Sequence, residues 1–118
     1  MFIKYSVPLL VWLMCLTFAR STQAQGIIDS LPSPGREPRG LAWDGEYLWC
    51  ADAGTDSVYK LDISNGTVIS SFPFSIESNY GGITWSDDNN MWIANGSYIY
   101  KVNPANGDVL YSFSCPGG

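Results

Sequence analysis

The stretch Gly40–Phe72, GLAWDGEYLWCADAGTDSVYKLDISNGTVISSF, carries the clearest structural signal, because the chain repeats it as Gly82–Phe113, GITWSDDNNMWIANGSYIYKVNPANGDVLYSF. Matching residues keep the same order in both copies: Gly40 and Gly82, Trp43 and Trp85, Trp49 and Trp92, Tyr59 and Tyr100, Lys60 and Lys101, Gly66 and Gly107, Phe72 and Phe113. The offset drifts between 41 and 43 residues, and the drift falls in turns, where single insertions cost little. A period of about 40 to 45 residues is typical of a β-propeller blade.

Each copy reads as four short strands separated by turns rich in Gly, Asn and Asp. We expect strands at 40–44, 47–52, 57–62 and 67–72 in the first copy and at 82–86, 91–95, 98–103 and 108–113 in the second. Apolar and polar residues alternate in several of these segments, as a strand with two unlike faces requires. The fold class is therefore predicted to be all-β, with four-stranded antiparallel propeller blades at 40–81 and 82–118 and no helix from residue 26 onward.

Residues 25–39 precede the first full blade. Gly26–Pro32 aligns with Gly66–Pro73, which holds the last strand of that blade, and the connectors that follow also correspond. We therefore expect one orphan outer strand followed by a connector. In closed propellers such a strand completes the blade formed by the far C-terminus, so that no sheet edge remains unpaired.

Residues 1–24 have the pattern of a secretory signal peptide. Lys4 supplies a positive start, an apolar run covers Val7–Ala19, and Thr22–Ala24 offers small residues for cleavage before Gln25. The alternative is a membrane anchor, but the apolar run is shorter than the roughly 20 residues that a span needs. We expect cleavage, no stable membrane span thereafter, and a secreted, periplasmic or cell-surface location.

The chain of 118 residues carries a net charge of −5. Because Lys4 and Arg20 lie in the predicted signal peptide, the mature chain would be more acidic still. Nucleic-acid binding is disfavoured, since it needs a basic surface. Histidine is absent, which excludes Ser-His-Asp and Cys-His nucleophile systems and His-ligated zinc. Paired carboxylates could still act as acid and base, but no catalytic constellation, cofactor or metal site is predicted.

Two blades and one strand cannot close a ring, because propellers have about four to eight blades. A blade left without neighbours would expose its apolar faces. Either the chain is the beginning of a longer propeller, or several copies assemble into one ring as a homo-oligomer. The surplus strand favours the longer propeller, because an assembly of two-blade copies needs only eight strands per copy.

The candidate ligand-binding residues are the four repeated tryptophans, Trp43, Trp49, Trp85 and Trp92. They could form sugar-stacking clefts between blades. Their recurrence at matching positions favours the alternative, in which they fill the space between adjacent sheets.

For several other residues we favour a structural role over a metal-binding or catalytic one. The cluster 87–90, DDNN, could bind Ca²⁺, but it lacks the spacing of a calcium loop and is more typical of a turn. Lys60 and Lys101 are expected to be strand residues beside Asp62 and Asn103, and not catalytic amines.

Two asparagines, Asn65 and Asn95, match the N-glycosylation pattern, although both also lie in predicted tight turns. Cys50 and Cys115 would be the only thiols of the mature chain. We expect them far apart and unbonded, with Cys50 at a buried strand position.

The motif GLAWDGEYLWCAD at 40–52, followed by SVYKLDISNGTVI at 57–69, resembles blades of the NHL/YVTN/gluconolactonase-like propeller superfamily. It is also similar to glutamine-cyclotransferase-like propellers, and the resemblance covers Gly26–Phe113. It implies an exported or periplasmic propeller, often a binding scaffold. Enzymatic members use polar residues gathered in a central funnel from several blades, and none of those residues is matched here.

These observations favour a binding or scaffold module whose partner is an unknown protein or a glycan. One alternative is a two-blade lectin that oligomerises into a closed propeller. Another is the non-catalytic start of a propeller lactonase or cyclotransferase.

Overall fold

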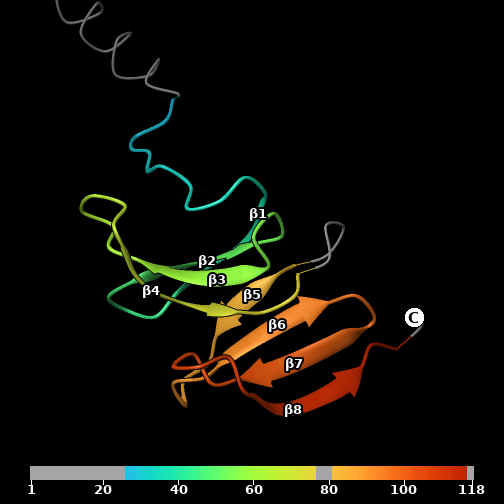
Figure 1. Ribbon diagram of the computed structural model, residues 1–118. Helices are drawn as coiled ribbons and strands as arrows, with labels where there is room; N and C mark the ends of the chain where they lie inside the picture. The colour runs from blue at the N-terminus through green and yellow to red at the C-terminus, as the bar shows by residue number, and fades with distance from the viewer. Residues whose placement is uncertain (1–25, 77–80, 117–118) are drawn as a thin grey trace, which may run out of the picture. The chain divides into compact units, whose positions relative to one another are not determined.

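The computed structural model describes residues 26–76 and 81–116, and within them it contains two four-stranded antiparallel sheets (Figure 1). The first sheet comprises β1 (Pro38–Trp43), β2 (Leu48–Asp52), β3 (Ser57–Leu61) and β4 (Val68–Pro73). The second comprises β5 (Ile83–Trp85), β6 (Met91–Asn95), β7 (Tyr98–Val102) and β8 (Val109–Ser114). In each sheet the strands follow one another in chain order, and both sheets lie within one compact unit, Leu31–Gly118.

The prediction of two four-stranded antiparallel blades is confirmed, and no helix occurs in the described residues. The strand bounds agree with the predicted ones to within two residues. β1 begins at Pro38, two residues earlier than expected, with an irregularity in its register between Pro38 and Gly40.

The segment 26–32 pairs with neither described sheet, and its pairing with a blade formed by the far C-terminus stays a prediction. A strand is stable only when its backbone N–H and C=O groups have a neighbouring strand to pair with. Both four-stranded sheets of the chain already have their own outer strands, β4 and β8, so the segment has no free edge of its own blade to join.

The last two residues of this alignment nevertheless have a structural counterpart. A Cβ atom added to Gly107 would lie 2.6 Å from the Phe72 ring and 3.2 Å from the Pro73 carbonyl oxygen. At Gly66, which is 41 residues earlier, an added Cβ atom would lie 2.9 Å from Pro32 and 3.7 Å from Leu31. Leu31–Pro32 therefore lies against the first sheet where Phe72–Pro73 lies against the second.

The strand register gives each sheet a forward face and a rear face, which we define by their residues. The forward face of the first sheet carries Gly40, Ala42, Trp49, Ala51, Val58, Lys60 and Phe72, and its rear face carries Leu41, Trp43, Leu48, Cys50, Tyr59 and Leu61. The forward face of the second sheet carries Gly82, Thr84, Trp92, Ala94, Ile99, Lys101 and Phe113, and its rear face carries Ile83, Trp85, Met91, Ile93, Tyr100 and Val102. Residues related by the sequence repeat occupy the same face.

The hydrophobic core forms where the rear face of the second sheet packs on the forward face of the first. Trp49, Val58 and Phe72 of the first sheet belong to one buried cluster with Met91 and Ile93 of the second. The connector between the sheets adds Ile76, and its Phe74 ring meets the Tyr100 ring edge-on at 5.6 Å. The contact between the sheets is therefore a continuous apolar layer.

The innermost strands approach each other closely at Gly40. A Cβ atom added there would lie 2.3 Å from the Gly81 carbonyl oxygen and 2.9 Å from the Ile83 nitrogen. Its repeat counterpart, Gly82, has no atom within 4 Å of the same position. The glycine at position 40 is required by the neighbouring sheet, whereas nothing in the described part of the chain crowds position 82.

Asp52 is the one charged residue that is buried in the described chain. Its carboxylate accepts hydrogen bonds from the Glu37 N–H at 2.7 Å, the Thr55 N–H at 2.8 Å and the Thr55 hydroxyl at 2.9 Å. These bonds offset the cost of burying the charge and fix the segment before β1 to the end of β2.

We expect Gly40→Ala to lower the free energy of unfolding by about 1–3 kcal/mol, because the added methyl group would push β5 away from β1. Gly82→Ala is the matched control and should change stability by less than about 0.5 kcal/mol, since its methyl group meets open space. Urea unfolding followed by tryptophan fluorescence measures both, and equal effects would contradict the packing described here.

Candidate functional site

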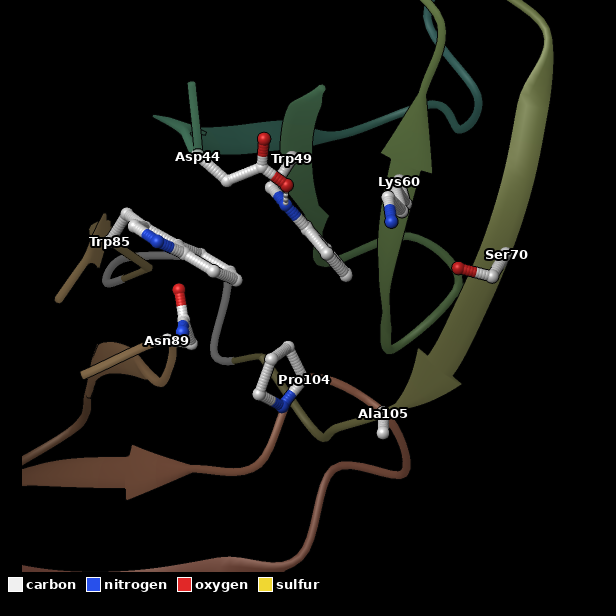
Figure 2. Close-up of a pocket in the computed structure, with 8 residues that line it drawn as sticks. All are labelled: Asp44, Trp49, Lys60, Ser70, Trp85, Asn89, Pro104 and Ala105. Carbon is white, nitrogen blue, oxygen red and sulfur yellow. Dashed lines mark hydrogen bonds between the residues drawn. The ribbon is translucent and has the colours of Figure 1, made fainter. Parts of the chain in front are cut away.

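A cleft of about 360 Å³ opens between the two sheets at one end of their contact (Figure 2). The first sheet contributes residues from the end of β1 and from the three following strands, and the second contributes β5 and two turns. The lining residues are Asp44, Trp49, Lys60, Ser70, Trp85, Asn89, Pro104 and Ala105. The site therefore exists only because the two blades stand side by side.

Two of the four candidate tryptophans form the aromatic wall of this cleft. Trp49 is almost entirely buried, and its ring stacks on Trp85 with a centroid distance of 5.7 Å and an angle of 22°. Trp49 also contacts Phe72 at 6.3 Å. Trp85 remains partly exposed beside the cleft. Trp49 thus serves as packing, while Trp85 offers surface to a ligand.

Asp44 fixes the geometry of Trp49. Its carboxylate accepts a hydrogen bond from the Trp49 indole N–H at 2.8 Å (Figure 2). It also accepts hydrogen bonds from the backbone N–H groups of Glu46 and Tyr47, at 2.8 and 2.7 Å. Burial raises the pKa of Asp44, but these hydrogen bonds and the nearby Lys60 charge outweigh it and hold the pKa below its ordinary value. Asp44 is therefore an ionised acceptor at neutral pH and not a proton donor.

Lys60 supplies the positive charge of the cleft. It is a strand residue of β3, as predicted, and its ammonium lies 4.2 Å from the centroid of the Tyr47 ring and 5.5 Å from that of Trp49. These are cation–π distances. Sequence reasoning missed this contact, although the recurrence of Lys60 as Lys101 was its available signal.

The cleft thus combines a partly exposed aromatic face with a carboxylate, an ammonium, the Ser70 hydroxyl and the Asn89 amide. An aromatic face binds apolar ligand surface, and the polar groups can exchange hydrogen bonds with hydroxyl groups. The arrangement suits recognition of a small polar molecule that has one apolar face.

The other two candidate tryptophans lie outside this cleft. Trp43 is on the rear face of the first sheet and is 49% exposed. Trp92 is on the forward face of the second sheet, where Phe113 meets it edge-on at 6.1 Å and the Lys101 ammonium lies 5.4 Å from its centroid. The four tryptophans therefore do not form one site.

The cluster 87–90 forms the turn between β5 and β6, as predicted, and Asn89 has a φ of 61°. Asp88 forms an ion pair with Lys101, and this hydrogen bond lowers the pKa of Asp88. Among the residues that the structure describes, no group of three or more His, Cys, Asp or Glu side chains could hold a metal ion.

The two glycosylation patterns differ in their surroundings. Asn65 is exposed, and its side-chain oxygen accepts a hydrogen bond from the Thr67 N–H at 2.9 Å, which leaves the amide nitrogen facing solvent. Asn95 is partly buried, and its amide nitrogen donates to the Ser75 carbonyl oxygen at 2.6 Å. Attachment of a sugar replaces one of the two amide hydrogens, so at Asn95 it would compete with that bond.

Cys50 and Cys115 are free thiols, the first buried and the second partly buried. Burial raises the pKa of Cys50, and the neighbouring Asp52 charge adds to the effect. The buried strand position predicted for Cys50 is confirmed, and its thiol is protonated at neutral pH.

Neither protein-family models nor curated proteins match this sequence. Solved structures do match, and the similar ones are β-propellers. They include hydrazine synthase from Kuenenia stuttgartiensis, with a TM-score of 0.56, 20% identity, and coverage of 80% of this chain and 28% of that one. A luciferin-regenerating enzyme has a TM-score of 0.55 and 24% identity, over 75% of this chain and 33% of that one.

A third similar structure is a catalytically inactive variant of virginiamycin B lyase from Staphylococcus aureus with quinupristin. Its TM-score is 0.56 and its identity 19%, over 81% of this chain and 33% of that one. The chain thus spans about a third of the length of these proteins. At such identities the likeness shows the fold, a partial β-propeller, and no activity.

In the described residues, no helix is long and apolar enough to cross a membrane.

Asp44→Ala should lower the free energy of unfolding by about 1–3 kcal/mol, because it leaves the buried Trp49 indole N–H without its acceptor. The stability that the ionised carboxylate provides depends on pH. Since its pKa in the folded chain lies below 3.8, this stability is complete above pH 3.8 and is lost as the pH falls through the lowered pKa.

Denaturant unfolding of the two proteins over a range of pH measures this difference. The stability gap between them should be constant at higher pH and narrow only in acid below 3.8. A gap that already closes near neutral pH would contradict the assignment of Asp44 as a hydrogen-bonded carboxylate.

Proposed function

We propose that this chain is a recognition module of an exported β-propeller and that the cleft between its two sheets binds a small saccharide. The observation that carries the proposal is the composition of the cleft, in which the Trp85 face stands beside Asp44, Lys60, Ser70 and Asn89. A sugar ring has one apolar C–H face and a rim of hydroxyl groups. The cleft offers a complement to both.

The size of the cleft agrees with this ligand class. Ligand pockets in proteins usually measure about 300–1,000 Å³, and this one, at about 360 Å³, lies near the lower limit. That volume suits one or two sugar units. The fixed orientation of Trp49, held by Asp44, supports Trp85 from behind and reduces the ordering cost of binding.

The charges in the cleft favour a neutral or mixed-charge ligand. Asp44 is ionised, and Lys60 lies close enough for its charge to lower the pKa of Asp44. A strongly anionic ligand would meet the carboxylate, and a strongly cationic one would meet the ammonium. Hydroxyl groups can accept from Lys60 and donate to Asp44.

A second candidate function is a part of a propeller enzyme such as a lactonase or cyclotransferase. It is favoured by the names of the three similar solved structures, all of which denote enzymes and of which this chain spans about a third. The ionised state of Asp44 favours ligand recognition over proton transfer by this cleft.

Glycan-microarray screening followed by titration of the bound sugar tests the proposal. Trp85→Ala should weaken binding by about tenfold or more, as expected for loss of a central aromatic contact. Because Trp85 also packs on Trp49, Asn89→Gly, which tolerates the positive φ at that position, and Ser70→Ala provide variants without that packing role and should weaken binding as well.

Tyr98→Ala is the matched control, since Tyr98 is an exposed aromatic residue that does not line the cleft. Absence of any bound sugar, or equal binding by the wild type and all three cleft variants, would refute the saccharide proposal.

Export belongs to the same proposal. If the chain passes through the secretory pathway of a glycosylating cell, its N-terminus should be Gln25, and a glycan should be attached at Asn65 in preference to Asn95. Peptide mapping by mass spectrometry reads both. Retention of residues 1–24, or a glycan on Asn95 with Asn65 empty, would contradict it.

A further inference from the structure

Two sheet faces are covered by no other sheet of the described chain, although Cys50 and Leu61 on one of them are buried, and the sequence repeat makes the two faces complementary. We propose that the forward face of the second sheet binds the rear face of the first sheet in a second copy of this chain, and that this contact builds a second ligand cleft. The proposed contact is argued from packing alone. The proposal that the second cleft binds a ligand rests on the function proposed above.

The contact between the two sheets of one chain is the template for this inference. In it, Ile83 and Trp85 on the rear face of the second sheet cover the first. Their repeat counterparts on the rear face of the first sheet are Leu41 and Trp43, which have the same character. Leu41 is 61% exposed, whereas Ile83 is 8% exposed. Leu41 and Trp43 of the first sheet therefore cover no other sheet of the described chain.

The forward face of the second sheet is the matching receptor. Trp92, Ile99 and Phe113 are the counterparts of Trp49, Val58 and Phe72, which the second sheet buries. Phe72 is 3% exposed, whereas Phe113 is 40% exposed. A shallow, largely apolar cavity of about 290 Å³ lies on this face, and its lining residues are Gly82, Ile83, Thr84, Trp92, Ala94 and Ile99.

Gly82 provides an independent observation. Its counterpart Gly40 lacks a side chain because the backbone of the next sheet, at Gly81–Ile83, lies against it. Gly82 has open space at the same position. By the template, that space is where the segment 39–41 of a second copy would lie. The proposed contact thus gives Gly82 the role that Gly40 already has within the chain.

The contact would complete a second cleft. Trp92, with the Lys101 ammonium 5.4 Å from its ring centroid, repeats the arrangement of Trp49 and Lys60, where the distance is 5.5 Å. Within the sheets of its own chain, Trp92 has no stacking partner that corresponds to Trp85. Trp43 of the second copy would take that place, so each copy contributes half of the site.

One segment opposes this contact. Leu31–Pro32 lies against Gly66 where, by the template, Phe113–Ser114 of the neighbouring copy would lie. The two cannot occupy the same place, so Leu31–Pro32 must move before a second copy can dock. The segment therefore acts as a competitor that weakens the association without removing the complementary faces.

The proposed contact joins two different faces, so it can repeat from copy to copy and close into a ring. Since propellers have about four to eight blades and each copy supplies two, rings of about two to four copies are expected.

Sedimentation velocity of the chain, measured over a range of concentration and without any sugar, tests the contact. Replacing Leu31 and Pro32 together by serine should strengthen association by about tenfold or more, because it weakens the competing segment. In that background, Trp43→Ala and Gly82→Leu should each reverse the gain, the first by removing the covering residue and the second by filling the receptor.

A mixing experiment separates this contact from general stickiness. The Trp43→Ala chain keeps an intact forward face, and the Gly82→Leu chain keeps an intact rear face. Each alone should remain a monomer, whereas their mixture should form a one-to-one dimer and nothing larger. Tyr98→Ala is the matched control, since Tyr98 is also 49% exposed but lies on the rear face of the second sheet.

The proposal is overturned if the chain with both serine substitutions stays monomeric at its highest soluble concentration. It is also overturned if association persists in both single-face variants, or if their mixture forms no dimer. These results are independent of sugar binding by the first cleft, which lies within one chain, so failure of either proposal is recognised separately.

Discussion

The apolar layer between the two sheets is the contact on which the rest of the structure depends. A sheet whose strands have only three to six residues depends for its stability on covering an apolar face. Here Met91 and Ile93 on one side and Val58 on the other are fully buried. Each such side chain contributes about 1.5–3 kcal/mol when removed from water. The layer thus converts two weak sheets into one folded unit, and it also sets the distance between the walls of the ligand cleft.

The cleft follows from that packing and from one turn. The turn after β1 directs the Asp44 carboxylate back toward β2, where three N–H groups converge on it. One of them is the Trp49 indole, so the carboxylate that closes the turn also orients the ring on which Trp85 stacks. The fold and the proposed recognition share these residues. For that reason a substitution at Asp44 acts on stability and on the cleft together.

The sequence was sufficient to predict the strands, because alternation and turn residues are local and each signal occurs twice. It also placed Cys50 on a buried strand position and 87–90 in a turn. It raised a cleft between blades lined by tryptophans only as the less favoured alternative, and it did not predict the polar residues that line the cleft. The cleft joins Asp44 and Lys60 of one sheet to Asn89 and Ala105 of the other, and such contacts depend on how the sheets pack.

The strand predicted at 26–32 is a different case, because the blade that it would complete is neither of the two described sheets. A strand needs a partner edge, and the match supplies only the sequence of one side. The sequence repeat predicts a position relative to the neighbouring blade. Leu31 and Pro32 keep the position against Gly66 that Phe72 and Pro73 keep against Gly107, without any strand pairing.

The two blades share their repeated residues but differ in burial, and this difference is informative. Phe72 and Phe113 differ in exposure although they occupy the same repeat position, so the difference arises from what lies next to each sheet and not from the residues themselves. The repeat thus acts as an internal control: a position that is buried in one blade and exposed in the other shows where the two sheets differ in their neighbours. Gly82 is the clearest case, because a glycine whose counterpart exists only to admit a neighbouring backbone has no other structural reason in the described chain.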